Sequence, residues 1–267
     1  FIGIDIATEN VRAVAIDNEG NLYGSTSEKL APVTGGSDKR LTQDPASWIA
    51  AVRKVLKELA TKCKIEGLTP KALCISATSG TFVITDIKGN PIANAAMYND
   101  GRASSIIGRA EKIIGEAKQS GPYLFANTPE FVIAHLAGVP LSEIATDSSH
   151  SLKIGLDLAS ITWNQPVLDQ VQSLNLTLPR LVLPGKKLAN ISSEISKQLG
   201  LDQIPIYAGM TDGCTAQISA GGSSGSVTSL GTTMVIKAVS KTNIKGASFY
   251  SHLLPKNRFL AGGASNI

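Results

Sequence analysis

The chain has 267 residues, of which 43% are hydrophobic and 5% aromatic, and its formal net charge is +4. This length and composition are typical of a folded α/β protein with one large domain or two ordinary ones, and they exclude a disordered chain. The charge is mild and no block of Lys and Arg concentrates it, so nucleic acid is not an expected partner, and no stretch of about 20 apolar residues is present to span a membrane.

The first predicted elements are three strands within residues 1–30, with a turn at residues 18–21. In the opening stretch FIGIDIATENVRAVAID, Asp5 interrupts an apolar strand, where an unpaired carboxylate is costly. Two explanations stay open. Asp5 caps the strand end and bonds to its own turn, or the strand, the aspartate and the turn with Thr8 together hold a metal ion and a phosphate.

The next predicted element is an amphipathic helix that begins at Asp44 and Pro45 and continues with apolar residues at helical spacing. A buried strand is expected at 72–76, followed by a small polar loop at 77–80 and a strand that ends at Asp86. Helical periodicity returns within 104–117 (SSIIGRAEKIIGEA). Residues 120–145 are hard to assign, apart from the helix-like stretch PEFVIAHLAG.

The last third of the chain predicts helices from Pro166 and within SSEISKQLG, then the strand PIYAG, the helix DGCTAQISAG and a hairpin at 225–240. We place a domain boundary in this region. Residues 1–210 are then an N-terminal domain, and residues 211–267 are the start of a second domain.

The two hairpins resemble each other. GIDIATENVRAVAID and TSLGTTMVIKAVS each contain a strand, a Thr-bearing polar turn and a second strand, more than 200 residues apart. Internal duplication is the economical explanation. Two such hairpins that face each other can present backbone N–H groups and hydroxyls to a polyphosphate, so the pattern predicts a nucleotide clamp.

A third feature is the stretch IPIYAGMTDGCTAQISAG, where a strand leads into Asp212 at the start of a helix. The positive end of a helix dipole favours a negative charge at this position. Asp212 is either a simple helix N-cap or an aspartate that accepts a proton from a sugar hydroxyl, and the stretch by itself leaves both open.

Other motifs carry little weight. GGSSG at 221–225 matches G-x-S-x-G, but a helix precedes it and a strand follows, the reverse of a hydrolase nucleophile elbow. The chain has no G-x-x-x-x-G-K-[ST] phosphate loop. His135, His150 and His252 lack metal-ligand spacing, so core or surface roles are expected. The three separated cysteines indicate neither a disulfide framework nor a zinc site and favour a reducing cytoplasm.

Four segments, GIDIATENVRA, MYNDGRA, YAGMTDGC and SLGTT, resemble in that order the FGGY family of carbohydrate kinases, of the actin and sugar-kinase superfamily. The resemblance extends over essentially the whole chain and is greatest to the xylulokinase and ribulokinase branch, especially the plant and cyanobacterial pentulose kinases. It implies an α/β, ribonuclease H-like fold with two domains on either side of a cleft.

The resemblance also implies a nucleotide site. Asp5 would help to hold the Mg²⁺ that accompanies ATP, and Thr8 would line the phosphate path in the first hairpin. Gly231, Thr232 and Thr233 would form the second phosphate hairpin.

The sugar site is implied in the same way. Asp212 would be the general base. Asp100, in the position of the acidic residue of a W-x-D-x-R motif, would bind sugar hydroxyls, with Arg102 fixing it. Ser79 and Gly80 occupy the loop where relatives have a bulkier segment, and this departure leaves the sugar preference open.

Two further departures concern missing parts. A helical, Trp-bearing segment expected around 122–132 is absent, and the adenine-binding motif is expected after residue 267. The chain also starts within a predicted strand without Met, so we expect both ends to be cut from a longer protein.

The implied activity is ATP-dependent phosphorylation of a ketopentose, D-ribulose or D-xylulose, at its terminal hydroxyl. ATP, Mg²⁺ and the sugar are the expected ligands, a homodimer is an open alternative, and the expected location is the cytoplasm, or the plastid stroma if the source is a plant. Glycerol or L-ribulose as substrate, a chaperone-like or actin-like ATPase, and a sugar sensor without turnover remain rival functions.

Overall fold

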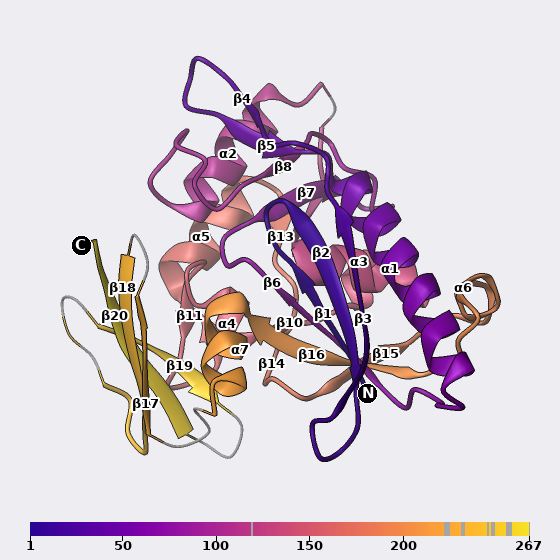
Figure 1. The fold of residues 1–267 in the computed structure, drawn as a ribbon. Helices are drawn as coiled ribbons and strands as arrows, with labels where there is room; N and C mark the ends of the chain where they lie inside the picture. Colours follow the sequence, from indigo (N-terminus) through magenta and orange to yellow (C-terminus); the bar gives the residue numbers. More distant parts are fainter. Residues whose placement is uncertain are drawn as a thin grey trace.

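The computed structural model describes residues 1–118, 120–221, 225–230, 233–244, 246, 249–254 and 258–266. Its largest feature is a mixed six-stranded sheet, whose strands pair in the order β15 (Lys187–Asn190), β16 (Pro205–Thr211), β6 (Leu73–Ala77), β1 (Ile2–Ile6), β2 (Asn10–Ile16) and β3 (Leu22–Lys29). The three central strands β16, β6 and β1 are parallel, and the other neighbouring pairs are antiparallel (Figure 1).

Helices α1 (Pro45–Ile65) and α3 (Thr128–Ala137) pack on one face of this sheet, and α6 (Ser193–Leu199) lies at the side of α1. The predicted start of α1 is confirmed, because the side chain of Asp44 accepts a hydrogen bond from Ala46 N at 2.9 Å and Pro45 is the first helical residue. An N-capped helix of 21 residues thus covers the sheet.

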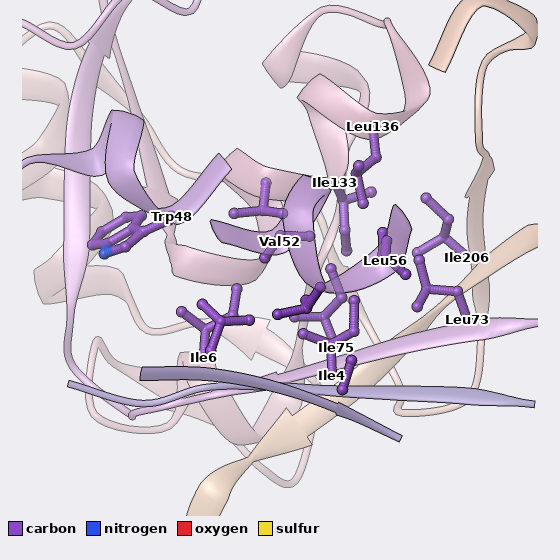
Figure 2. Close-up of a cluster of buried hydrophobic side chains, with 14 of the residues drawn as sticks. Ile4, Ile6, Trp48, Val52, Leu56, Leu73, Ile75, Ile133, Leu136 and Ile206 are labelled. Carbon is purple, nitrogen blue, oxygen red and sulfur yellow. The ribbon is translucent and has the colours of Figure 1, made fainter. Parts of the chain in front are cut away.

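The main core lies between α1, α3 and the sheet (Figure 2). Trp48, Val52 and Leu56 form the buried stripe of α1, at the helical spacing that the sequence predicts. They face Ile4 and other β-branched residues of β1 and β6. Burial of such side chains removes apolar surface from water at about 25 cal/mol per Å², so this layer holds the sheet and the helices together.

A second six-stranded sheet has its own core. Its order is β13 (Leu176–Thr177), β9 (Tyr123–Asn127), β7 (Phe82–Asp86), β8 (Ala95–Ala96), β5 (Leu41–Gln43) and β4 (Thr34–Gly35). The rings of Phe82 and Phe125 stack with centroids 4.8 Å apart. Helices α2 (Ile106–Glu116) and α5 (Gln165–Ser173) supply the apolar residues that close this core.

Short elements connect the two sheets. They are η1 (Leu141–Glu143), α4 (Ser148–Ser151), the parallel pair β10 (Thr146–Asp147) and β14 (Leu181–Val182), and the antiparallel pair β11 (Leu156–Asp157) and β12 (Thr162–Trp163). The segment 120–145, which the sequence left unassigned, contains β9, α3 and η1. The residues of β9 are all buried, so this short run shows no alternation of apolar and polar residues that would identify a strand.

After β16 the chain forms α7 (Asp212–Ser219) and then a separate antiparallel sheet of β17 (Ser226–Leu230), β18 (Thr233–Ser240), β20 (Arg258–Asn266) and β19 (Tyr250–Leu254). The predicted second hairpin is confirmed as β17 and β18, with Leu230 opposite Met234. In Figure 1 this sheet lies on the far side of α4 and α7 from α1. None of the helices in the described part of the chain is long and apolar enough to cross a membrane.

Candidate active site

The parallel strands β1, β6 and β16 end at the same edge of the first sheet, and their carboxyl ends supply the site. Asp5 pairs with Ser76, and Ala77 pairs with Thr211. Asp212 follows directly as the first residue of α7. Ligands bind at this edge in open α/β sheets, so the topology gathers residues that are far apart in the sequence.

Close contact between β16 and β6 requires a glycine at position 209. A Cβ on Gly209 would lie 2.0 Å from the carbonyl oxygen of Ile75. The register between β16 and β6 also shifts between Ala208 and Thr211. This irregularity redirects the chain immediately before Asp212 and aims the start of α7 at the edge of the sheet.

Asp5 lies on β1 opposite Arg12 of β2, and Arg12 Nη1 is 3.6 Å from Asp5 Oδ2. Its Oδ1 is buried and accepts no hydrogen bond from the described residues. Burial raises the pKa of Asp5, the negative charge of Asp212 raises it further, and Arg12 opposes both effects. Asp5 therefore shares a site with Asp212, although 206 residues separate them in the chain, and it does not bond to its own turn.

Thr8 lies in the turn between β1 and β2, which a hydrogen bond from Ala7 N to Asn10 O at 3.0 Å closes. Gln43 fixes this turn from β5, because its Nε2 donates to the carbonyl oxygen of Thr8 at 2.9 Å. The Oε1 of Gln43 in turn accepts a hydrogen bond from Trp48 Nε1 at 2.8 Å. Sequence reasoning missed Gln43, since nothing in a single sequence links a strand residue to a distant turn.

Asp212 is exposed at the start of α7, and the helix N-cap is Thr211. The N-cap explanation for Asp212 is therefore wrong by one residue. One carboxylate oxygen accepts a hydrogen bond from Gly213 N at 2.6 Å, and the other has no protein partner among the described residues. A carboxylate held at one oxygen and open at the other is suited to accept a proton.

Asp212 borders a cleft of about 860 Å³ between the edge of the first sheet and β18, and so does Arg12, the partner of Asp5. Its lining residues are Ala7, Thr8, Glu9, Asn10, Arg12, Thr78, Ser79, Tyr98, Lys153, Asp212 and Val235. This cleft is larger than a pentose needs, so it has room for part of a nucleotide as well.

Lys153, on the segment after α4, is the cleft cation that sequence reasoning missed. Burial lowers the pKa of its ammonium group, while the negative charge of Asp212 acts in the opposite direction. The two groups are thus close enough to interact. A lone lysine in a polar segment carries no signal that would have identified it.

Ser79 and Gly80 form the turn between β6 and β7, as the sequence predicts. Gly80 has φ +90°, a conformation that other residues rarely adopt. Ser79 lines the cleft, and its Oγ has no hydrogen-bond partner in the part of the chain that the structure describes. This buried hydroxyl therefore has an unused hydrogen-bonding capacity beside the cleft.

Asp100 and Arg102 are placed differently. The side chain of Asp100 has no exposed surface, and its oxygens accept hydrogen bonds from Leu41 N at 3.1 Å, Arg102 N at 3.1 Å and Arg102 Nε at 3.0 Å. Neither residue borders the cleft; Tyr98 of the same loop does. Arg102 instead borders a separate hollow of about 240 Å³ with Arg40 and Glu116.

The second phosphate hairpin is only partly described. Gly231 and Thr232 lie outside the described residues, and of Thr233 the backbone is described, at the start of β18. Val235 of the same strand lines the cleft, so β18 borders the cleft from the side opposite β1.

The donor set at the cleft suits Mg²⁺. Asp5 and Asp212 are hard oxygen donors, and the buried Oδ1 of Asp5 lacks a partner in the described residues. Within that same part of the chain no three His, Cys, Asp or Glu side chains cluster as a complete metal cage. Mg²⁺ commonly binds through one or two carboxylates, water and substrate phosphates, so a pair of aspartates fits it without a cage.

Comparisons with known proteins agree with this geometry. The model of the FGGY family of carbohydrate kinases, N-terminal domain, matches residues 1–128. The xylulose kinase of Staphylococcus epidermidis is 25% identical over 98% of this chain and 58% of its own length. The chain thus spans little more than half the length of this relative.

Solved structures with low sequence identity share the fold. The xylulose kinase of Rhodospirillum rubrum superposes with a TM-score of 0.86 at 18% identity, over 98% of this chain and 60% of the other. The glycerol kinase of Plasmodium falciparum, solved with ADP, gives 0.80 at 15% identity, over 99% and 60%. The predicted α/β, ribonuclease H-like fold is therefore confirmed. Residues 1–128 thus match the N-terminal domain of the FGGY family of carbohydrate kinases, and almost the whole chain is similar to a xylulose kinase.

Proposed function

We propose that the protein is an ATP-dependent carbohydrate kinase that transfers the γ-phosphoryl group of ATP to the terminal hydroxyl of a ketopentose, D-ribulose or D-xylulose. The observation that carries this proposal is that Asp5 and Asp212 lie at one edge of the first sheet. Asp212 borders the cleft, and Asp5 is close enough to it for the charge of Asp212 to raise the pKa of Asp5. Phosphoryl transfer needs an acidic anchor for the nucleotide and a base for the acceptor, and the pair supplies both.

Asp212 is the general base in this proposal. Its open carboxylate oxygen accepts the proton of the sugar hydroxyl while the oxygen of that hydroxyl attacks the γ-phosphorus of ATP. Its other oxygen, held by Gly213 N, keeps the side chain from rotating away. Because the phosphoryl transition state demands little covalent help, fixing this geometry is the main contribution of the protein.

The remaining cleft residues hold the phosphates. Thr8 lines the phosphate path on one side, and β18, which follows the predicted second phosphate hairpin, borders the cleft through Val235. Lys153 is placed to neutralise charge that develops on the transferred group. Asp5 would hold Mg²⁺, which when bound screens the charges of the phosphates.

The sugar site lies between Ser79, Gly80 and the loop that carries Tyr98. The partnerless Ser79 Oγ supports a direct contact with a sugar hydroxyl. Asp100 and Arg102 stay sugar-site candidates; since their side chains are enclosed, we propose that they act by holding Tyr98 at the cleft. Four features of the protein remain predictions: a domain boundary at residue 210, a homodimer, a cytoplasmic or plastid location, and a place in the plant and cyanobacterial branch.

The test is an ADP-release assay of the complete polypeptide with D-ribulose, D-xylulose, L-ribulose and glycerol, and with no acceptor as the control. We expect a pentulose to raise ADP release at least about tenfold over the control and to give the largest kcat/KM. If glycerol gives the largest kcat/KM, the protein is a glycerol kinase and the pentulose proposal is wrong. ADP release that no acceptor changes would support the ATPase alternative, and ligand binding without turnover would support the sensor.

A further inference from the structure

A buried polar cluster lies directly behind the cleft, at α4, and the proposed chemistry does not use it. The side chains of Asp147, Ser149 and His150 are all almost completely buried. Helix α4 contacts β16 on one side and β19 on the other (Figure 1). Buried charged groups are rare unless they are paired, so a cluster at this position calls for a role.

Asp147 is the centre of the cluster. Its Oδ1 accepts hydrogen bonds from Ser149 N at 2.8 Å and Ser149 Oγ at 2.5 Å, and its Oδ2 contacts His150 Nδ1 at 2.5 Å. Each of its oxygens therefore has a protein partner. Its carboxylate is held rigidly within one turn of the chain.

His150 connects this centre to the loop of the sugar site. Its Nδ1 faces the carboxylate of Asp147, and its Nε2 lies 3.2 Å from the carbonyl oxygen of Ala77. Both partners are acceptors, and only the imidazolium form donates from both nitrogens. Ala77 ends β6 immediately before Thr78 and Ser79, which line the cleft.

Ser149 connects the same centre to the candidate base. Its hydroxyl donates to Asp147, so a lone pair of the Oγ is free to accept the backbone N–H of Thr211 at 2.9 Å. Thr211 is the residue before Asp212 and the N-cap of α7. The carboxylate of Asp147 therefore anchors two backbone segments at the cleft. It holds Thr211 through Ser149 and Ala77 through His150.

We propose that Asp147, Ser149 and His150 form a positioning unit that fixes the candidate base Asp212 and the 78–80 loop relative to each other. The inference rests on the proposed kinase function. A buried ion pair adds little net stability compared with an apolar replacement, whereas it does specify one geometry. The structure gives this unit links to the site, which a merely structural pair would lack.

Two neighbouring serines provide a matched test. Ser148 and Ser149 are both fully buried, but Ser148 Oγ has no hydrogen-bond partner among the described residues. We expect Ser149→Ala to lower kcat for the best pentulose by about 10- to 100-fold, because small displacements of a reacting group have effects of this size, with the sugar KM changed less than about threefold. Ser148→Ala should leave both within about twofold, and Ser149→Thr, which keeps the hydroxyl, should restore most of the rate.

A second measurement is independent of turnover. NMR of the protein labelled at aspartate reports the Cγ resonance of Asp212, and amide exchange reports the N–H of Thr211. We expect Ser149→Ala and His150→Gln to shift the Asp212 resonance and to speed Thr211 exchange, and Ser148→Ala to change neither. This readout applies even if a variant is less stable.

The outcomes separate the two proposals. If the wild type turns over no sugar, the proposed function fails, and the Asp212 resonance still decides whether the unit positions that residue. If the wild type is active and Ser149→Ala matches Ser148→Ala in kcat and in the Asp212 resonance, the positioning unit is refuted while the kinase assignment stands.

Discussion

The start of α7 and the loop of residues 97–102 each carry an aspartate near the cleft, and the two carboxylates have opposite surroundings. Asp212 is exposed, with one oxygen held by the neighbouring Gly213 N. Asp100 has no exposed side-chain surface, and the backbone of Leu41 and the guanidinium of Arg102 occupy its oxygens. The first carboxylate is free for chemistry, whereas the second is committed to structure.

This difference shows how surroundings decide what an aspartate can do. An exposed carboxylate with an open oxygen can accept a proton or bind a ligand at small cost. An enclosed one must first lose its partners, and a charge left without them in a buried site is strongly unfavourable. Substitutions at the two positions should therefore act on different quantities, catalysis in one case and stability in the other.

The largest expected effect is at Asp212. Asp212→Asn should lower kcat by about 10²- to 10⁴-fold while sugar affinity and the free energy of unfolding stay nearly unchanged, because it removes a base from an exposed position. Steady-state kinetics and thermal unfolding measure the two quantities. Asp202→Asn, at an exposed loop position before β16, is the control, and a mutant at Asp212 that keeps a tenth of the wild-type turnover would exclude it as the base.

Asp100 should respond in the opposite way. Asp100→Ala leaves the buried guanidinium of Arg102 without its partner, so we expect the free energy of unfolding to fall by about 3 kcal/mol, measured by urea denaturation. The double variant Asp100→Ala with Arg102→Met should recover part of this loss. A single variant with unchanged stability and a greatly weakened sugar affinity would instead assign Asp100 to direct sugar binding.

The third prediction compares two aspartates of one hairpin. Asp17, at the far end of β2, accepts hydrogen bonds from Glu19 N and Asn21 N, whereas Asp5 bonds to no turn. Asp5→Ala should lower kcat at least about tenfold, roughly 1.4 kcal/mol, and weaken the dependence of turnover on Mg²⁺, because the ion loses its anchor. Asp17→Ala should leave the magnesium titration curve unchanged. An unaltered curve for Asp5→Ala would remove Asp5 from the metal site.

The smallest effect concerns the buried layer behind the cleft. Burial raises the pKa of Glu130 to about 7, and Asp147, aided by Glu130, raises the pKa of His150 to about 9 despite its burial. Both folded-state values exceed the unfolded ones, so the stability that these groups contribute is present at low pH and is lost as pH rises. The loss runs from about pH 4.5 to 7 for Glu130 and from about 6.5 to 9 for His150.

Thermal unfolding across this pH range is the measurement. The unfolding temperature should fall as pH rises from about 6.5 to 9, and His150→Gln should flatten this part of the curve. At lower pH the lowered pKa of His252 opposes the effect of Glu130, so the contribution of Glu130 is measured as the difference between the wild-type and Glu130→Gln curves. Other charged groups that face His150 are Asp147 and His252, and neither titrates in the upper part of this window, since the pKa of Asp147 is lowered and that of His252 falls to about 4. A wild-type curve that rises between pH 6.5 and 9 would contradict the assignment.

The sequence by itself determined several elements, among them α1 and the two hairpins, and it identified Asp5 and Asp212 as candidate site residues. Local signals were sufficient for this, since Asp44 before Pro45 predicts the start of α1, and the apolar spacing of Trp48 and Val52 predicts its buried face. The motifs around Asp5 and Asp212 indicated the resemblance to FGGY kinases, because each motif lies in one short segment at the end of a strand.

The tertiary structure alone decided how carboxylates and hydroxyls divide between chemistry and structure. The enclosure of Asp100 depends on Leu41, which lies 59 residues away, and the link from Ser149 to Thr211 spans 62 residues. Periodicity and motifs report neighbours along the chain, whereas solvent exposure and charge pairing depend on residues that folding brings together. For this reason Lys153, Gln43 and the His150 cluster carried no sequence signal, and the accessibility of each aspartate was fixed only when the sheets packed.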